Sequence, residues 1–108
     1  MAVEVRQVGG NAWAVGVSTN ASAIIVPAVT GKRIRIISCF LMSLTAVQMN
    51  LNNGSGGSDL IIGQTGANGG FTLPPSDRGW GQTDVSTGVY LTLSSGVLTT
   101  GVIVFEYV

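Results

Sequence analysis

The sequence contains no histidine and only one cysteine. Histidine is the commonest general acid or base in enzymes, and it activates most serine and cysteine nucleophiles. Its absence excludes a Ser–His or Cys–His nucleophile within one chain. Structural and catalytic zinc sites are built mainly from cysteine and histidine, so this composition also argues against a zinc centre.

Few acidic side chains remain that could do chemistry. A glycosidase needs two carboxyl groups about 5 to 10 Å apart in a cleft, and Asp77 and Asp84 flank Trp80 in a way that resembles a sugar site. Asp77 follows Pro-Pro-Ser and precedes Arg78, however, so turn capping or an ion pair with Arg78 is the better interpretation. The loop 52–59 holds one carboxylate, which is too few for a convincing calcium site. We therefore expect no enzyme, no metal site and no cofactor.

Charge is also scarce. Charged residues make up 9% of the chain, five basic and five acidic, and the formal net charge is zero. A nucleic-acid partner requires clustered lysine and arginine, and the one basic cluster, Lys32, Arg33 and Arg35, alternates with isoleucines like the polar face of a strand. We expect no nucleic-acid partner. A nearly uncharged surface has little colloidal repulsion and favours association.

Cys39, the lone cysteine, excludes an internal disulfide. It lies in the apolar run 36–44, where a free cysteine usually serves as a small buried hydrophobe. The longest apolar stretch, 34–44, is interrupted by polar residues and is about half as long as a membrane helix. Residues 1–10 contain no apolar run of signal-peptide length. We expect a protein made in a cytoplasm, without a cleaved signal and without a membrane partner.

Short alternating segments separated by glycine, proline and asparagine fill the chain. Glycine interrupts every window of helical length except 32–53, whose isoleucine, serine and threonine favour strand. About eight to ten short strands at roughly ten-residue spacing are typical of a sandwich or barrel. We predict an all-β, jelly-roll-like antiparallel β-sandwich, with an immunoglobulin-like sandwich or a small barrel as alternatives. The chain is a single domain, in which 1–18 form an N-terminal arm and the first strands and 19–108 form the sandwich.

Three segments, 36–44, 59–62 and 102–108, carry apolar residues on both faces of a predicted strand. A strand with one face on the core and one face exposed to solvent should alternate apolar with polar residues. The first interpretation is a central strand, or a bulge that shifts the register once. The second is that the extra apolar face meets another subunit, because large apolar patches usually mark interfaces. On the second we predict a homo-oligomer with an interface formed by Ile37, Cys39, Leu41, Ile103, Phe105 and Tyr107.

The order of the segments is distinctive. Ile24-Ile25-Val26-Pro27 precedes Gly31-Lys32-Arg33-Ile34-Arg35-Ile36, and a glycine-rich middle leads to Gly69-Gly70-Phe71-Thr72-Leu73-Pro74, Arg78-Gly79-Trp80 and Gly88-Val89-Tyr90-Leu91-Thr92-Leu93-Ser94. Over residues 20–108 the sequence resembles the small jelly-roll decoration, or cement, proteins of tailed bacteriophage capsids, and also phage virion proteins of undefined role.

The resemblance implies a location and partners. A decoration protein of this kind is made in the host cytoplasm and sits on the outer capsid surface of the virion. It would form a homotrimer at local three-fold positions, bind the major capsid protein and bridge neighbouring capsomers.

The segment 2–8 alternates and has two interpretations. It is either the first strand of the sandwich or an arm that adds a strand to a partner sheet. In the second case it would dock on the capsid through Val3, Val5, Arg6 and Val8.

A competing function is recognition of a receptor or carbohydrate by the β-sandwich of a phage tail fibre. Trp13, Trp80 and Tyr90 would then supply a stacking platform for a ligand. A third possible function is that of a connector in the phage tail or neck, which would also act as an oligomer.

Overall fold

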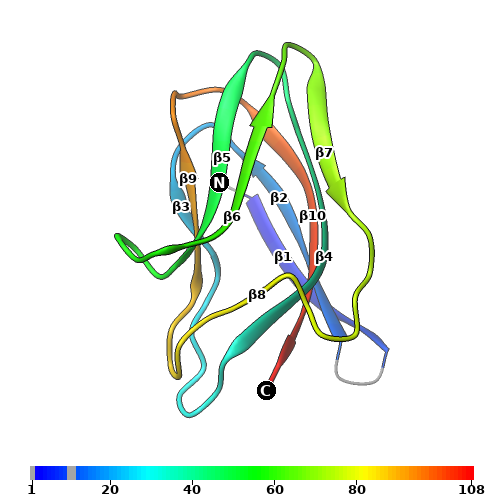
Figure 1. Cartoon of the computed structure of the whole chain (residues 1–108), viewed down its shortest axis with the longest axis vertical. Helices are drawn as coiled ribbons and strands as arrows, with labels where there is room; N and C mark the ends of the chain where they lie inside the picture. Colours follow the sequence, from blue (N-terminus) through cyan, green and yellow to red (C-terminus); the bar gives the residue numbers. More distant parts are fainter. Residues whose placement is uncertain (1, 10–11) are drawn as a thin grey trace.

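The structure is a computed structural model that describes the backbone of residues 2–9 and 12–108 and the side chains from residue 12 onward. Within these residues the chain forms ten β-strands and no helix. The strands make two antiparallel sheets packed face to face (Figure 1), which confirms the predicted β-sandwich. The strands are β1 Ala2–Gly9, β2 Ala12–Thr19, β3 Ala23–Val26, β4 Ile34–Ser43, β5 Val47–Asn53, β6 Asp59–Thr65, β7 Gly69–Leu73, β8 Gly81–Gln82, β9 Val89–Leu93 and β10 Thr99–Tyr107.

The strand order is that of a jelly roll. One sheet has six strands in the order β1-β2-β10-β4-β7, with β8 paired to β4, and the other has four in the order β3-β9-β5-β6. The chain pairs β5 with β6, β4 with β7, β3 with β9 and β2 with β10, so successive pairs fall in alternate sheets. This is a long hairpin rolled into two Greek keys, the arrangement of a double-sheet jelly roll. β1 extends the six-stranded sheet at one edge.

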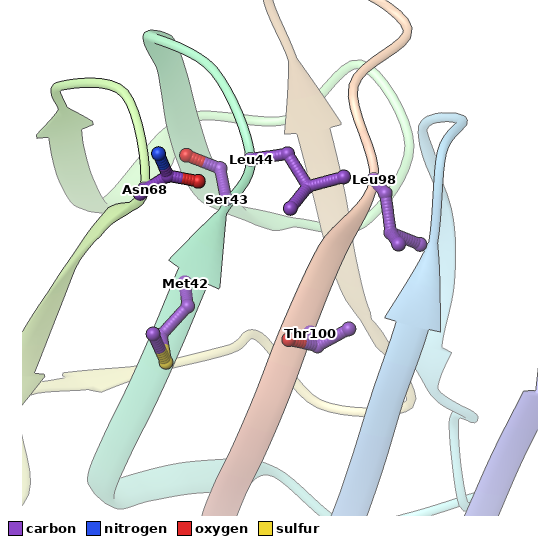
Figure 2. A pocket seen from close by; sticks show the side chains of 6 residues that line it. All are labelled: Met42, Ser43, Leu44, Asn68, Leu98 and Thr100. Carbon is purple, nitrogen blue, oxygen red and sulfur yellow. The ribbon is translucent and has the colours of Figure 1, made fainter.

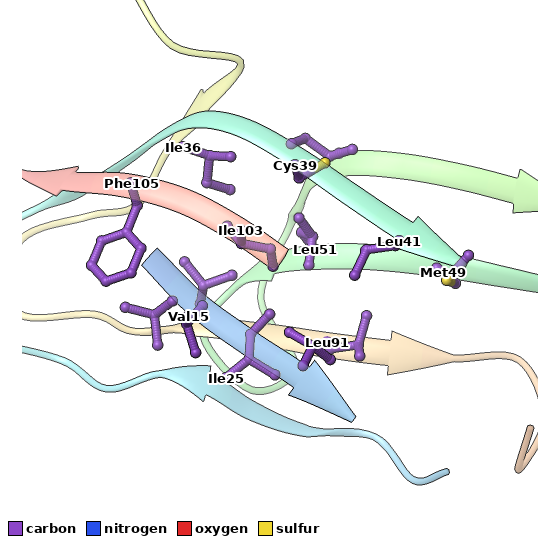
Figure 3. Packing of buried hydrophobic residues seen from close by; sticks show 14 of the residues in the cluster. Val15, Ile25, Ile36, Cys39, Leu41, Met49, Leu51, Leu91, Ile103 and Phe105 are labelled. Atoms are coloured by element: carbon purple, nitrogen blue, oxygen red, sulfur yellow. The ribbon is translucent and has the colours of Figure 1, made fainter. Parts of the chain in front are cut away.

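The core lies between the sheets and is almost wholly aliphatic (Figure 3). Ile103 and Phe105 project from β10 and face Leu51 and Leu91 of the four-stranded sheet, and all four are fully buried. Burying each such side chain stabilises the folded state by about 1.5–3 kcal/mol relative to exposure. A continuous apolar layer therefore holds the two sheets together.

A bulge in β4 decides which of its apolar side chains face the core. Along β10, Val104 is the Cα partner of Ser38, but Phe105 is the partner of Ile36, which leaves Ile37 as the extra residue. One extra residue reverses the alternation of side chains. Buried residues on either side of the bulge therefore all face the core: Ile34, Ile36, Cys39 and Leu41.

Candidate interaction surface

Most of the residues predicted to form the oligomer interface lie inside the protomer. Leu41, Ile103 and Phe105 are fully buried and Cys39 is 3% exposed. These four side chains already fill the space between the sheets, so they offer no surface to a second copy, and placing them in an interface was wrong. The first of the two interpretations, a bulge that shifts the register once, is the one found here: the bulge at Ile37 turns this row of β4 inward.

The other two predicted residues lie at the margin of the core. Tyr107 is partly buried and packs edge-on against Phe105, with ring centroids 5.4 Å apart. Ile37 is partly exposed at the bulge itself. Burial raises the pKa of the Tyr107 hydroxyl, consistent with its position beside the apolar core.

The exposed apolar surface lies on the opposite side of the same strands. Phe40 of β4 and Val102 of β10 are Cα partners on the outer face of the six-stranded sheet, and they are 44% and 38% exposed. Met42 follows on β4 at 40%, and Leu44 and Leu98 lie just beyond the strands at 56% and 42%. These five residues form the outer patch. The i, i+2, i+4 spacing of its β4 members places them on one face of the chain.

Two uncharged hollows adjoin the outer patch. Met42, Leu44, Leu98 and Thr100 line a hollow of about 130 Å³, completed by Ser43 and Asn68. Figure 2 shows Met42 on β4 and Thr100 on β10, with Leu44 and Leu98 at the ends of these strands.

The second hollow lies on the other side of Phe40. It measures about 200 Å³, and its side chains come from three strands and the turn after β7, including Phe40, Thr72, Pro74, Val102 and Val104. None of the described residues that line these hollows is charged. The ring of Phe40 therefore stands between two depressions on a face that presents apolar and hydroxyl groups.

Among the described side chains of this face, a charged pair lies at one end. Arg35 of β4 and Glu106 of β10 are Cα partners, and the Arg35 Nη1 lies 2.8 Å from the Glu106 Oε1. The Arg35 Nε also donates to the Gln82 Oε1 at 3.3 Å. Since the two charges neutralise one another, they put little net field over the outer patch.

The outer face of the four-stranded sheet is different. Amides and hydroxyls cover it, and Gln48 Nε2 donates to Asn50 Oδ1 at 3.2 Å. Two large apolar residues, Ile24 and Ile62, are exposed there, one on each edge strand. Ile24 is the Cα partner of Tyr90 and Ile62 that of Asn50, at opposite edges of the sheet, so the two do not form a cluster like the outer patch.

The three aromatic residues considered for ligand stacking do not act together. Trp13 packs against the core and edge-on to Tyr107, at a centroid distance of 6.2 Å. Trp80 lies between β7 and β8, is 43% exposed, and donates its indole N–H to the Pro74 carbonyl at 2.7 Å. Tyr90 belongs to β9 in the other sheet. Trp13 is therefore removed from the predicted stacking platform, because a side chain packed on the core cannot stack on a ligand.

The segment predicted to dock on the capsid forms β1. Its backbone pairs antiparallel with β2, with Val3 opposite Val17 and Val5 opposite Val15, and the register shifts between Gln7 and Gly9. The side chains of Val3, Val5, Arg6 and Val8 lie outside the described residues. Docking through them stays a prediction.

Among the described residues, the side chains that could take part in chemistry include Cys39 and Asp84, of which the first is buried and the second is held by hydrogen bonds. Burial raises the pKa of the Cys39 thiol to about 11, against a smaller lowering by a backbone hydrogen bond from Leu73. Asp84 Oδ2 accepts a hydrogen bond from Asn53 Nδ2 at 2.9 Å, and the Asp84 backbone N–H donates back to Asn53 Oδ1 at 2.9 Å. In the part of the chain that the structure describes, no three residues among cysteine, aspartate and glutamate come together as metal ligands would.

No protein-family model, curated protein or solved structure matches this chain. Among the described residues there is also no helix of the length and hydropathy needed to span a membrane. Function must therefore be inferred from the residues and their arrangement.

Proposed function

We propose that this protein is a capsid decoration protein of a tailed bacteriophage. It binds the assembled head as a homo-oligomer, a trimer by its resemblance, and stabilises the shell without catalysing a reaction. The outer patch carries the proposal, because it gathers five large exposed apolar side chains on one sheet face of a chain with zero net charge. Contiguous apolar surface of this kind is typical of proteins that work in contact with other proteins.

The physical basis of such a role is simple. A protein that binds the assembled shell but not its free subunits stabilises the shell by mass action. An oligomer also presents several shell-binding surfaces at once, so the overall affinity can exceed that of a single copy by about 10²- to 10⁴-fold. The jelly roll supplies a rigid body for this purpose, since its core is fully packed by aliphatic side chains.

The surroundings of the carboxylates support a structural role. Asp84 closes a loop by hydrogen bonding with Asn53, and Asp59 accepts hydrogen bonds from Asn50 and Asn52. Carboxylates held by amide donors in this way link loops to strands. Glu106, in turn, is paired with Arg35.

Co-sedimentation tests the proposal. Shells of the phage that encodes this protein are assembled without it, mixed with the purified chain and pelleted. We expect saturable binding to the shells, weak binding to unassembled major capsid protein, and a higher temperature of shell disruption. Failure to bind shells, or equal binding to shells and free subunits, would contradict the proposal.

The competing function is glycan or receptor recognition, and one observation favours keeping it in the test. Trp80 is 43% exposed and its indole ring is fixed by the hydrogen bond to the Pro74 carbonyl. Binding on a glycan array that disappears in Trp80→Ala, together with no binding to shells, would replace the decoration role by this one.

A further inference from the structure

We propose that the outer patch is the contact between copies of this chain, with a second copy laying its own outer patch against the first. The inference deepens the proposed function and rests on its oligomeric part. A two-fold contact of this kind pairs two copies, so it replaces the trimer implied by the resemblance with a dimer. It moves the interface from the core residues to Phe40, Met42, Leu44, Leu98 and Val102.

The size of the surface suits a second copy. Each residue of the outer patch is 38% to 56% exposed. Taking about 180 Å² for a fully exposed large apolar side chain, the five present about 400 Å² of apolar surface. This is already as large as the largest apolar patch of a typical monomer, which measures about 300–600 Å². The adjoining uncharged residues Thr72, Pro74, Thr100 and Val104 extend it toward the roughly 800 Å² per partner of a stable interface.

The shape of the surface is self-complementary. In a two-fold contact, residue i of one copy meets residue j of the other, and the reverse contact is made at the same time. Such a contact needs a projection and a matching depression on the same face. Phe40 is 44% exposed and itself lines the hollow of about 200 Å³ with Val102 and Val104, so an exposed aromatic side chain and a depression lie side by side on this face. Phe40 of each copy would therefore enter this hollow in the other copy.

The charge of this surface also favours a second copy of the chain as its partner. The described residues lining the two hollows are all uncharged, and Arg35 and Glu106 at the end of the face neutralise one another. Two copies with zero net charge each do not repel one another over long range.

The opposite sheet provides the matched control. Ile62 is 60% exposed on β6, more than any residue of the outer patch, yet it stands on the polar outer face of the four-stranded sheet. Its side chain has the same aliphatic character without the surrounding apolar surface. A charge introduced at Ile62 should therefore leave self-association unchanged.

Sedimentation velocity of the full chain over a range of micromolar concentrations tests the inference. We expect wild type to sediment as more than one chain, and the variants Phe40→Asp and Val102→Asp to shift toward the 11.1 kDa monomer. Each should weaken association at least tenfold, because burying an unpaired carboxylate is strongly unfavourable. The control Ile62→Asp should associate like wild type. Circular dichroism and thermal unfolding report whether each variant folds, and Phe40→Thr replaces Phe40→Asp if the latter does not.

The outcomes separate this inference from the proposed function. A monomeric wild type, or association that Ile62→Asp weakens as much as Phe40→Asp does, would overturn the self-contact. Phe40→Asp that stays oligomeric but no longer pellets with shells would assign the outer patch to the shell and also overturn it, while the decoration role stands. Wild type that self-associates through the outer patch but binds no shells would support the self-contact and contradict the decoration role.

Discussion

Gly101 of β10 lies directly against the backbone of Phe40 on the neighbouring strand β4. A Cβ atom placed on Gly101 would overlap the Phe40 carbonyl group and lie 2.9 Å from the Leu41 Cα. The φ angle of Gly101 is +155°, a conformation that residues with a side chain rarely adopt. Glycine is therefore required here by both space and backbone conformation, at the centre of the sheet that carries the outer patch.

Replacing Gly101 by alanine should destabilise the fold by about 2–4 kcal/mol, since the backbones of two central strands must move apart. Urea unfolding followed by circular dichroism measures the change. Gly16→Ala on β2 is the matched control, because a Cβ there meets no atom of the described residues within 4 Å. That control should change stability by less than about 1 kcal/mol, in the stabilising direction. Equal losses in the two variants would contradict the close approach of β10 to β4.

The Cys39 thiol should make stability fall at high pH. Burial raises its pKa from about 9 to about 11, so between these values the folded chain keeps a proton that the unfolded chain has lost. The free energy of unfolding must then decrease as pH rises through this window. The decrease is on the order of 2 kcal/mol, from about 1.4 kcal/mol per pKa unit.

Urea unfolding of wild type and Cys39→Ala at several pH values from 8 to 11 isolates this contribution. Burial also raises the pKa of Tyr107, but that group titrates in both proteins. The stability difference between wild type and Cys39→Ala should therefore shrink as pH rises. A difference independent of pH would show that the thiol is not buried in the folded chain. Labelling by a thiol reagent at neutral pH should likewise require unfolding.

The fold could be predicted from the sequence because most of its strands are bounded by local signals. Glycine and proline end the strands, and the alternation of residues such as Val89, Leu91 and Leu93 identifies their buried faces. β8, Gly81–Gln82, is an exception, because it has only two residues and exists through its pairing with Arg35 and Ile36 of β4. A pairing of this kind is set by the tertiary fold and leaves no periodic signal in the sequence.

The interaction surface was harder to predict because β4 offers two apolar rows. One row holds Phe40 and Met42, and the other holds Cys39 and Leu41. The bulge at Ile37 decides which row faces the core, and its position depends on how β10 pairs with β4. Local sequence cannot fix that register, so the apolar character of both faces was predictable while the choice between them was not.

The ion pair between Arg35 and Glu106 should contribute little to stability. Both side chains are partly exposed, at 30% and 23%, with Nη1 and Oε1 2.8 Å apart. Water and salt screen such a pair, so Glu106→Gln should cost about 0.2–1 kcal/mol. The free energy of unfolding is measured for both proteins in low and high salt. The difference in this free energy between wild type and Glu106→Gln should decrease in high salt. A loss of several kcal/mol that salt does not reduce would show that the pair is isolated from solvent, contrary to its exposure.

Asn52 should contribute much more, because it is a buried amide that joins three parts of the four-stranded sheet. It is 6% exposed; its Nδ2 donates to Asp59, and its Oδ1 accepts from the Thr92 hydroxyl at 2.6 Å. Asn52→Leu keeps the volume but removes these hydrogen bonds and a third, from Nδ2 to the Gly57 carbonyl at 3.4 Å, and leaves the Thr92 hydroxyl without its acceptor. We expect a loss of about 2–3 kcal/mol in urea unfolding.

The matched control for Asn52→Leu is Asn50→Leu, two residues earlier on the same strand and the same face but partly exposed. Water can replace the hydrogen bonds of Asn50, so its substitution should cost less than about 1 kcal/mol. Adding Thr92→Val to Asn52→Leu should recover part of the loss, because the hydroxyl that lost its acceptor is then removed as well. If the double variant is instead less stable by the sum of the two single losses, Thr92 and Asn52 do not interact and the hydrogen bond between them does not contribute to the fold.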